Sequence, residues 1–152
     1  MQEITYRKLE PKDINRFIEL RKLQLIDEGS KETVDITDSL SDYFKRHLAD
    51  GTFISWVAEA DGEIIATSGI SFFEKPPYFN NPSGLIGLLS CMYTVPAYRR
   101  KGIAKKLIDL IINEAKEYGC TVIQLTASDE GTLLYENYGF LRNKDFFFLK
   151  VD

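Results

Sequence analysis

Cysteine and histidine are scarce in this chain, which has two cysteines and one histidine among its 152 residues. Cys91 and Cys120 lie far apart in the sequence, without the spacing of a zinc site, and two cysteines are too few for a disulfide scaffold. We therefore expect both cysteines to be reduced and buried, and we expect no metal site. The single histidine, His47, falls on a predicted exposed helix and reads as a surface residue.

The chain also lacks long apolar runs and an excess of positive charge. No stretch approaches the roughly 18 consecutive apolar residues that a membrane-spanning helix needs, and residues 1–12 are polar and charged, unlike a secretory signal. The 19 Lys and Arg residues are outnumbered by 23 Asp and Glu residues, so the formal net charge is −4. This balance disfavours a nucleic-acid partner. We expect a cytoplasmic protein that binds neither nucleic acid nor membrane.

The hydrophobic content of 44% is typical of one folded unit, and we expect a single domain over residues 1–152 without internal repeats. Periodicity predicts both strands and helices. The expected strands are residues 4–9, 54–60, 63–73, 85–95 and 121–127, with one or two more in 140–151. The expected helices run from 11 to about 28, from a cap at Ser39 or Ser41 to about 49, from 103 to 118 and from 129 to 138.

The order of these elements predicts a mixed sheet. Asp61 and Gly62 separate two strands and form a strong two-residue hairpin signal, so those strands are expected to be antiparallel. In the second half of the chain, strands alternate with helices, which implies a right-handed crossover and at least one parallel pair. The fold class is therefore an α/β mixed sheet with helices on its faces. Residues 74–84 hold three prolines and are expected to be a surface loop that makes substrate-specific contacts.

A basic, glycine-containing turn joins the strand at 85–95 to the helix at 103–118. Its sequence is Arg99, Arg100, Lys101, Gly102, Ile103, Ala104. The N-terminus of a helix leaves backbone N–H groups unpaired and carries a partial positive charge, so it attracts anions. Gly102 allows close approach of an anion to the backbone. This turn therefore predicts a phosphate-binding site.

With this turn, the chain resembles the GNAT superfamily of acyl-CoA-dependent N-acetyltransferases. The family's pyrophosphate motif is Arg or Gln, two residues, Gly, one residue, then Gly or Ala, and residues 99–104 match it. About thirty residues later, Leu134, Tyr135, Gly139 and Phe140 match the family's Leu-Tyr-x-x-x-Gly-Phe ending. The resemblance implies a mixed, mostly antiparallel sheet of six to seven strands that splays open beside its fourth strand, with about four helices on its faces.

The resemblance also implies that acetyl-CoA is the co-substrate. The backbone of the turn would hold the pyrophosphate, and the end of the preceding strand would pair with the pantetheine arm as an added strand. Ser128 stands where the family often has an asparagine against this arm, although capping of the following helix explains it equally well. The cofactor-binding residues implied are Tyr93, Thr94, Val95, Arg99, Arg100, Lys101, Gly102, Ile103, Ala104, Lys105, Ser128 and Tyr135.

Tyr135 is the candidate general acid for the departing thiolate, because a phenol has a pKa of about 10 and a thiol one of about 8.5. The alternative is that Tyr135 is a packed helix residue. Many family members carry a glutamate base on the strand at 85–95, but this chain has Ser90, Cys91 and Met92 there. The candidate substitutes are a water relay at Ser90 and the carboxylates of Glu28, Asp27 and Glu74.

The function expected from the resemblance is transfer of an acetyl group from acetyl-CoA to a primary amine of a small molecule, by direct attack in a ternary complex. Two alternatives stay open: a non-catalytic acyl-CoA-binding regulatory module, and a protein or aminoacyl-tRNA acetyltransferase. A homodimer is a further possibility. The acceptor is expected to contact the first two helices and the 74–84 loop.

Overall fold

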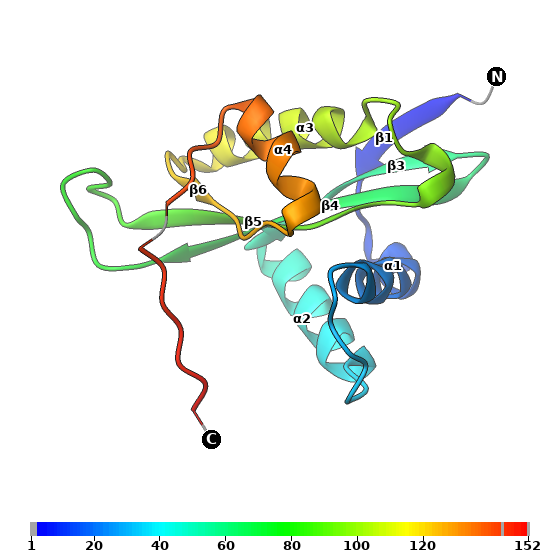
Figure 1. The fold of residues 1–152 in the computed structure, drawn as a ribbon, viewed down its shortest axis with the longest axis horizontal. Coiled ribbons are helices and arrows are strands. Elements are labelled where there is room, and N and C mark those ends of the chain that lie inside the picture. Colours follow the sequence, from blue (N-terminus) through cyan, green and yellow to red (C-terminus); the bar gives the residue numbers. More distant parts are fainter. Residues whose placement is uncertain (1–2, 144, 152) are drawn as a thin grey trace.

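The computed structural model describes residues 3–143 and 145–151. Over these residues the chain forms one mixed sheet with helices on both faces (Figure 1). The strands are β1 (Ile4–Lys8), β2 (Phe53–Ile54), β3 (Trp56–Ala60), β4 (Glu63–Glu74), β5 (Leu85–Thr94) and β6 (Ile123–Gln124). The helices are α1 (Ile14–Asp27), α2 (Thr37–Asp50), α3 (Ile103–Tyr118) and α4 (Asp129–Tyr138), with short 3₁₀ turns at Pro11–Asp13 and Pro96–Tyr98.

The strand order is β1-β3-β4-β5-β6, and β2 pairs with β4 beside this row. The pairs β1–β3, β3–β4 and β4–β5 are antiparallel, whereas β5 and β6 are parallel. The predicted mixed, mostly antiparallel sheet and the hairpin at Asp61 and Gly62 are therefore confirmed. Figure 1 shows α1 and α2 on one face of the sheet and α3 and α4 on the other.

Each face of the sheet has its own apolar core. Beneath α1 and α2, the rings of Phe17, Phe44 and Phe53 pack against one another at centroid distances of 4.9 to 6.1 Å, two pairs T-shaped and one tilted. On the opposite face, Leu107 and Ile111 of α3 are fully buried against the sheet. The i, i+4 spacing of the apolar residues of α3 predicted this contact. The two cysteines, Cys91 and Cys120, are both buried and free, as expected.

Three predicted element boundaries were wrong. The strand predicted at 54–60 is divided at Ser55. Next to it, the hydroxyl of Ser68 in β4 bonds both the N–H and the carbonyl of Trp56 in place of a backbone ladder. The second helix begins at Thr37 rather than after Ser39 or Ser41, because Asp35 Oδ1 accepts hydrogen bonds from both the N–H and the hydroxyl of Thr37. The strand predicted at 121–127 is reduced to the two residues of β6.

The one or two strands predicted within residues 140–151 are absent from the described residues 140–143 and 145–151. The segment instead runs away from the body of the molecule (red in Figure 1) and has no strand neighbour in the described chain. A strand needs a partner for its backbone N–H and C=O groups. Strand propensity alone therefore did not place this segment in the sheet.

Candidate functional site

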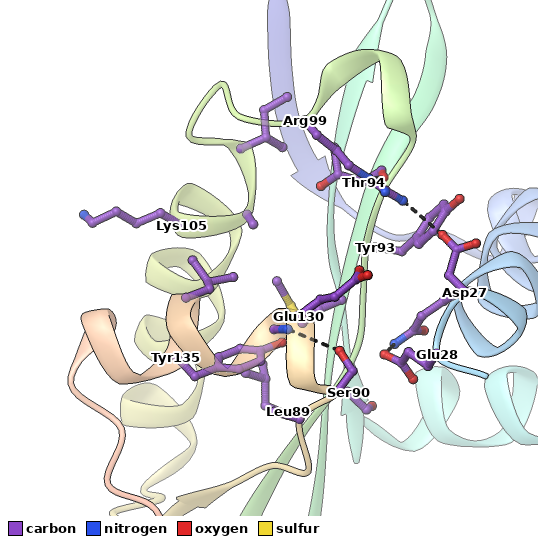
Figure 2. A pocket seen from close by; sticks show the side chains of 18 of the residues that line it. Asp27, Glu28, Leu89, Ser90, Tyr93, Thr94, Arg99, Lys105, Glu130 and Tyr135 are labelled. Carbon is purple, nitrogen blue, oxygen red and sulfur yellow. Dashed lines mark hydrogen bonds and ion pairs between the residues drawn. The ribbon is translucent and has the colours of Figure 1, made fainter. Parts of the chain in front are cut away.

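A cavity of about 630 Å³ opens where β5 separates from β6. Its walls are the second half of β5, the turn that leads into α3, the segment before α4, and the C-terminal end of α1. Figure 2 shows the side chains that line this opening, with Tyr135 on one side and Asp27 and Glu28 on the other. Elements that are far apart in the sequence thus meet at one site.

The opening exists because β5 and β6 pair over a very short length. The parallel ladder consists of Gly87 opposite Ile123 and Leu88 opposite Gln124. Beyond Leu88 the two segments diverge, and the following residues of β5 line the cavity. Since β5 is the fourth strand in the row β1-β3-β4-β5-β6, the predicted splay beside the fourth strand is confirmed.

A β-bulge in β5 accompanies this divergence. Cys91 has a φ of +57°, and the register between β4 and β5 shifts between Thr67 and Gly69. The buried hydroxyl of Thr67 donates to the Cys91 carbonyl at 2.7 Å and holds the distorted backbone in place. Because a bulge bends its strand and increases its twist, it redirects the end of β5 beside the opening. Burial raises the pKa of the Cys91 thiol, so Cys91 does not provide a thiolate nucleophile.

The N-terminus of α3 faces the cavity. Gly102 is the N-cap with φ +78° and provides no side-chain cap for the helix, and Arg100 also has a positive φ of 63°. The residues of the first turn, Ile103 and Ala104, line the cavity together with Lys105. The helix α3 is 16 residues long, and its N-terminus opens into the cavity without a side-chain cap. Such an N-terminus presents unpaired N–H groups and positive potential to an anion. This geometry suits the pyrophosphate of an acyl-CoA.

The side chain of Arg99 holds the walls of the cavity together. Its Nε donates to the Thr94 carbonyl at 2.8 Å, and its Nη2 lies 3.1 Å from Asp27 Oδ2. Its guanidinium also lies over the Tyr93 ring, 5.4 Å from the centroid. Figure 2 shows the Arg99–Asp27 pair bridging the end of β5 and the end of α1. In this structure Arg99 positions the strand end, which sequence reasoning did not anticipate.

The three strand-end residues that were expected to pair with pantetheine differ in their positions. Tyr93 and Thr94 line the cavity. Val95 does not line it, and its N–H already donates to the Ile65 carbonyl at 2.9 Å. The N–H of Val95 therefore faces β4, which does not favour the expected pairing of Val95 with the pantetheine arm. In a strand, the N–H and C=O groups of successive residues point to opposite edges. Because the N–H of Val95 points toward β4, the N–H and C=O of Thr94 point toward the opening.

Tyr135 projects from α4 into the cavity (Figure 2). Its ring packs edge-on against Phe140 with centroids 5.8 Å apart. Burial, with a further contribution from the negative charge of Glu28, raises the pKa of Tyr135 to about 12. Its phenol therefore keeps its proton throughout the neutral range and is available as a hydrogen-bond donor.

Glu28 follows the last residue of α1 and is held from the same helix. Gln24, one turn earlier, is buried and donates from Nε2 to Glu28 Oε1 at 3.2 Å. Gln24 Oε1 in turn accepts from Arg21 Nη1 at 2.9 Å. Figure 2 shows Glu28 beside Ser90, near the β5 positions at which the sequence lacks an acid. Here the candidate carboxylate is supplied by a helix instead of the strand.

Two serines line the cavity in different ways. Ser128 is the N-cap of α4, and its Oγ accepts from Gly131 N–H at 3.2 Å, so the capping interpretation is confirmed. Ser90 Oγ lies 3.7 Å from Cys91 Sγ and borders the cavity between Glu28 and Tyr135. A water held at Ser90 would have both groups nearby.

Other expectations are corrected by the geometry. Residues 74–84 do not line the cavity, because the loop is a hairpin tip closed by the Tyr78–Asn81 bridge and projects from the far end of β4 and β5. Glu74 is therefore not a base at this site. Lys101 does not line the cavity either, and its Nζ lies over the Tyr98 ring.

Sequence reasoning did not single out several lining residues, among them the polar Gln24 and Glu130. The spacing of Gln24 and Glu28, four residues apart on one helix, was a signal that the two side chains meet. Glu130 lies in the first turn of α4, where an acid is favourable for the helix dipole alone, so its sequence position carried no functional signal. Figure 2 shows its side chain within the opening.

Within residues 3–143 and 145–151, the His, Cys, Asp and Glu side chains form no group of three or more that would hold a metal ion. The helices of these same residues include none with the length and apolar character needed to cross a membrane.

Comparisons with known proteins agree on one family. A model of the acetyltransferase (GNAT) family matches residues 15–140. A solved structure from Clostridium acetobutylicum, described as a predicted acetyltransferase with acetyl-CoA, is 40% identical with a TM-score of 0.94, covering 97% of this chain and 96% of that chain. A GCN5-related N-acetyltransferase from Ralstonia eutropha is 24% identical with a TM-score of 0.90 and shows the same fold over 97% of this chain and 99% of its own.

Curated relatives are also N-acetyltransferases. N-alpha-acetyltransferase 30 of Saccharomyces cerevisiae is 31% identical over 149 residues, which cover 95% of this chain and 80% of that protein. The uncharacterized N-acetyltransferase YjgM of Escherichia coli is 35% identical over 88 residues, which cover 56% of this chain. The matched residues span about half of the YjgM chain (49%).

Proposed function

The chain belongs to the GNAT acetyltransferase family, and from that membership we propose that it transfers the acetyl group of acetyl-CoA to a primary amine of a small molecule. The amine attacks the thioester carbonyl directly while both substrates are bound, giving an amide and free CoA thiol. Residues 1–152 act as one domain in this proposal. The observation that carries it is the cavity in which the α3 N-terminus, Glu28 and Tyr135 meet.

The donor half of the site is the turn and the end of β5. The N–H groups at the start of α3 would hold the pyrophosphate. The positive charges of Arg100 and Lys105, which line the cavity, would assist them. The N–H of Thr94, whose carbonyl accepts from Arg99, would donate to the pantetheine arm as in strand addition. Arg99 would keep this strand end in place through its bonds to Thr94 and Asp27.

The acceptor half is acidic. Asp27, Glu28 and Glu130 all line the cavity, so it favours a cationic amine over an acidic acceptor. An alkyl ammonium, with a pKa of about 10.4, must lose a proton before it attacks. Glu28 would accept that proton, directly or through a water held at Ser90, and Gln24 would keep its carboxylate oriented.

Tyr135 would act on the leaving sulfur mainly as a hydrogen-bond donor. Its pKa of about 12 is higher than the pKa of an ordinary thiol, near 8.5. The phenol is therefore the weaker acid, with a dissociation constant roughly three powers of ten smaller. Complete proton transfer from Tyr135 to a thiolate is therefore uphill, whereas a hydrogen bond to the developing charge is favourable. In this role the phenol stabilises the CoA thiolate, and solvent protonates the thiolate afterwards.

A second candidate acceptor is the α-amine of a protein or peptide, favoured by the match to N-alpha-acetyltransferase 30 over 95% of this chain. An α-amine has a pKa of about 8 and is partly neutral at physiological pH. It would therefore depend less on Glu28 than an alkyl amine does.

The test is an assay of the purified protein with acetyl-CoA and a panel of amines, in which free thiol is measured with a chromogenic disulfide. The panel contains polyamines, amino acids, aminoglycosides and short peptides with free α-amines. Fastest turnover with a small alkyl amine is expected. Preference for peptides would favour the second candidate, and tight acetyl-CoA binding without turnover on any amine would favour a non-catalytic acyl-CoA-binding module.

A further inference from the structure

Arg21 lies in α1 and does not line the cavity, yet its side chain is connected to the site through one other residue. Its Nη1 donates to Gln24 Oε1 at 2.9 Å, and Gln24 Nε2 donates to Glu28 Oε1 at 3.2 Å. The three residues stand at positions i, i+3 and i+7 of α1 and its C-cap, so they share one face of the helix. A directed chain of hydrogen bonds therefore runs along α1 and ends at the Glu28 carboxylate in the cavity (Figure 2).

The guanidinium of Arg21 has no other hydrogen-bond or ion-pair partner within residues 3–143 and 145–151. Its charge is instead directed at β5. Burial raises the pKa of the Cys91 thiol, and the positive charge of Arg21 opposes this shift whereas the negative charge of Glu28 adds to it. Both ends of the hydrogen-bond chain therefore lie near the strand that borders the cavity.

The side-chain amide of Gln24 has two orientations, which differ in the end that carries the oxygen. An arginine only donates hydrogen bonds, so Arg21 fixes the oxygen toward itself and the NH₂ group toward Glu28. An ionised carboxylate only accepts, so Glu28 needs that NH₂ group. Gln24 is buried, which keeps both ends of the amide dependent on protein partners. The reversed amide would set its oxygen against the carboxylate oxygen of Glu28.

We propose that Arg21 is a positioning residue for the acetyl transfer, because it fixes the amide of Gln24 in the orientation that holds the Glu28 carboxylate toward the acceptor amine. This inference rests on the proposed role of Glu28 as the base. Within the described chain, Gln24 is the one hydrogen-bond donor to the Glu28 side chain. The other charged or titratable groups around Glu28 come from α1, the turn before α3, β5 and α4: Asp27, Arg99, Cys91, Tyr93, Glu130 and Tyr135.

The first test is the rate of acetyl transfer to a small alkyl amine by Arg21→Met, which removes the donor and keeps an unbranched side chain. Its kcat should fall about 3- to 10-fold, the range expected for loss of one hydrogen bond, and its KM for acetyl-CoA should not change. Arg21→Lys should recover most of the rate, because lysine also only donates. Arg16→Met is the matched control, since Arg16 lies in the same helix but donates to the Ile64 carbonyl. Equal losses of kcat in Arg21→Met and Arg16→Met would overturn the proposal.

The second test is a double-mutant cycle between Arg21 and Glu28. If Arg21 acts through Glu28, Arg21→Met should cause no further loss of kcat in a chain that already carries Glu28→Gln. The same fold loss in both backgrounds would show that Arg21 acts independently of Glu28 and would overturn the proposal.

The third test does not depend on activity. The side-chain ¹⁵N–¹H signals of Gln24 are measured by NMR in the full chain and identified by their absence in Gln24→Met. Arg21→Met should shift these signals, and Arg16→Met should leave them in place. Unchanged Gln24 signals in Arg21→Met would overturn the role of Arg21 even where Glu28 is the base. Full activity of Glu28→Gln would instead refute the proposed base, so the two failures are distinguishable.

Discussion

Glu28 and Tyr135 act on one another across the cavity: the negative charge of Glu28 contributes to raising the pKa of Tyr135 to about 12. Glu28 follows α1 and Tyr135 lies in α4, so more than a hundred residues of sequence separate them. The structure thereby sets a carboxylate opposite a phenol that stays protonated. A proton acceptor and a hydrogen-bond donor on opposite sides of one opening are what amide formation from a thioester requires.

Tyr135→Phe should lower kcat about 10- to 100-fold and leave the KM for acetyl-CoA nearly unchanged. A hydrogen bond to a charged group contributes about 1.5–3 kcal/mol, and about 1.4 kcal/mol corresponds to a factor of ten in rate. Steady-state kinetics with saturating amine measure the change. Tyr138→Phe is the matched control, because its hydroxyl donates to Asp109 at 2.6 Å and only ties α4 to α3. Equal losses of kcat in both variants would contradict the role of Tyr135.

Glu28→Gln should reduce kcat/KM for an alkyl amine most strongly near neutral pH, by roughly 100-fold or more. The loss should shrink as pH rises toward the amine's own pKa of about 10.4, since the free amine then forms without a base. A pH–rate profile from pH 6.5 to 9.5 measures this effect. Gln24→Met should show the same pH dependence with a smaller loss, because it removes the hydrogen bonds of Gln24 with Glu28 and Arg21 but leaves the Glu28 carboxylate in place. A uniform decrease at every pH would argue against Glu28 as base.

Gly102→Ala should raise the KM for acetyl-CoA and also reduce stability by about 1–2 kcal/mol, the cost of a left-handed conformation for alanine. Gly51→Ala is the control, because Gly51 has φ +79° and Gly102 has φ +78°, and an added Cβ meets nothing within 4 Å at either residue. Both variants should lose similar stability in urea unfolding. Only Gly102→Ala should weaken CoA binding measured by calorimetry, and the same effect in Gly51→Ala would exclude a specific role for the α3 N-terminus.

Stability should decline at alkaline pH between about 10 and 12. The pKa of Tyr135 is about 12 in the folded protein against about 10 for the unfolded chain. As pH rises, Tyr135 therefore loses its proton first in the unfolded state, which favours unfolding. The full contribution of Tyr135 to the free energy of unfolding is present only below about pH 10. Urea unfolding from pH 8 to 11.5 tests this, and Tyr135→Phe should make the decline shallower. An unchanged slope in that variant would contradict the shift.

Much of the fold followed from short-range patterns. The i, i+4 apolar residues of α3 and the Gly119 that ends it predicted a helix with the observed bounds, because helix periodicity and caps are local properties. The strand predicted at 121–127 was too long, since its residues diverge from β5 after two pairs. The strands predicted within 140–151 failed for a related reason: strand formation depends on a neighbour that local sequence does not specify.

The candidate site divides in the same way. The motif from Arg99 to Ala104 and the ending at Leu134 to Phe140 identified the family and predict the donor site, because helix N-termini and tight turns carry their chemistry in adjacent residues. Arg99 stays a predicted cofactor-binding residue, and its bonds to Thr94 and Asp27, which join distant segments, were not predictable from the motif. Gln24 and Glu130 carried no recognisable motif and are identified by their place in the cavity wall.

The amino-acid sequence alone was thus enough to determine the family, the mixed sheet and the position of the turn before α3, at residues 99–104. The tertiary structure decided which carboxylate faces Tyr135, that residues 74–84 lie away from the cavity, and that the C-terminal phenylalanines are exposed. The physical reason is one of range. Turns, caps and periodicity depend on neighbours within a few residues, whereas a cavity, the residues that face each other across it and the burial of a segment depend on which distant segments the sheet brings together.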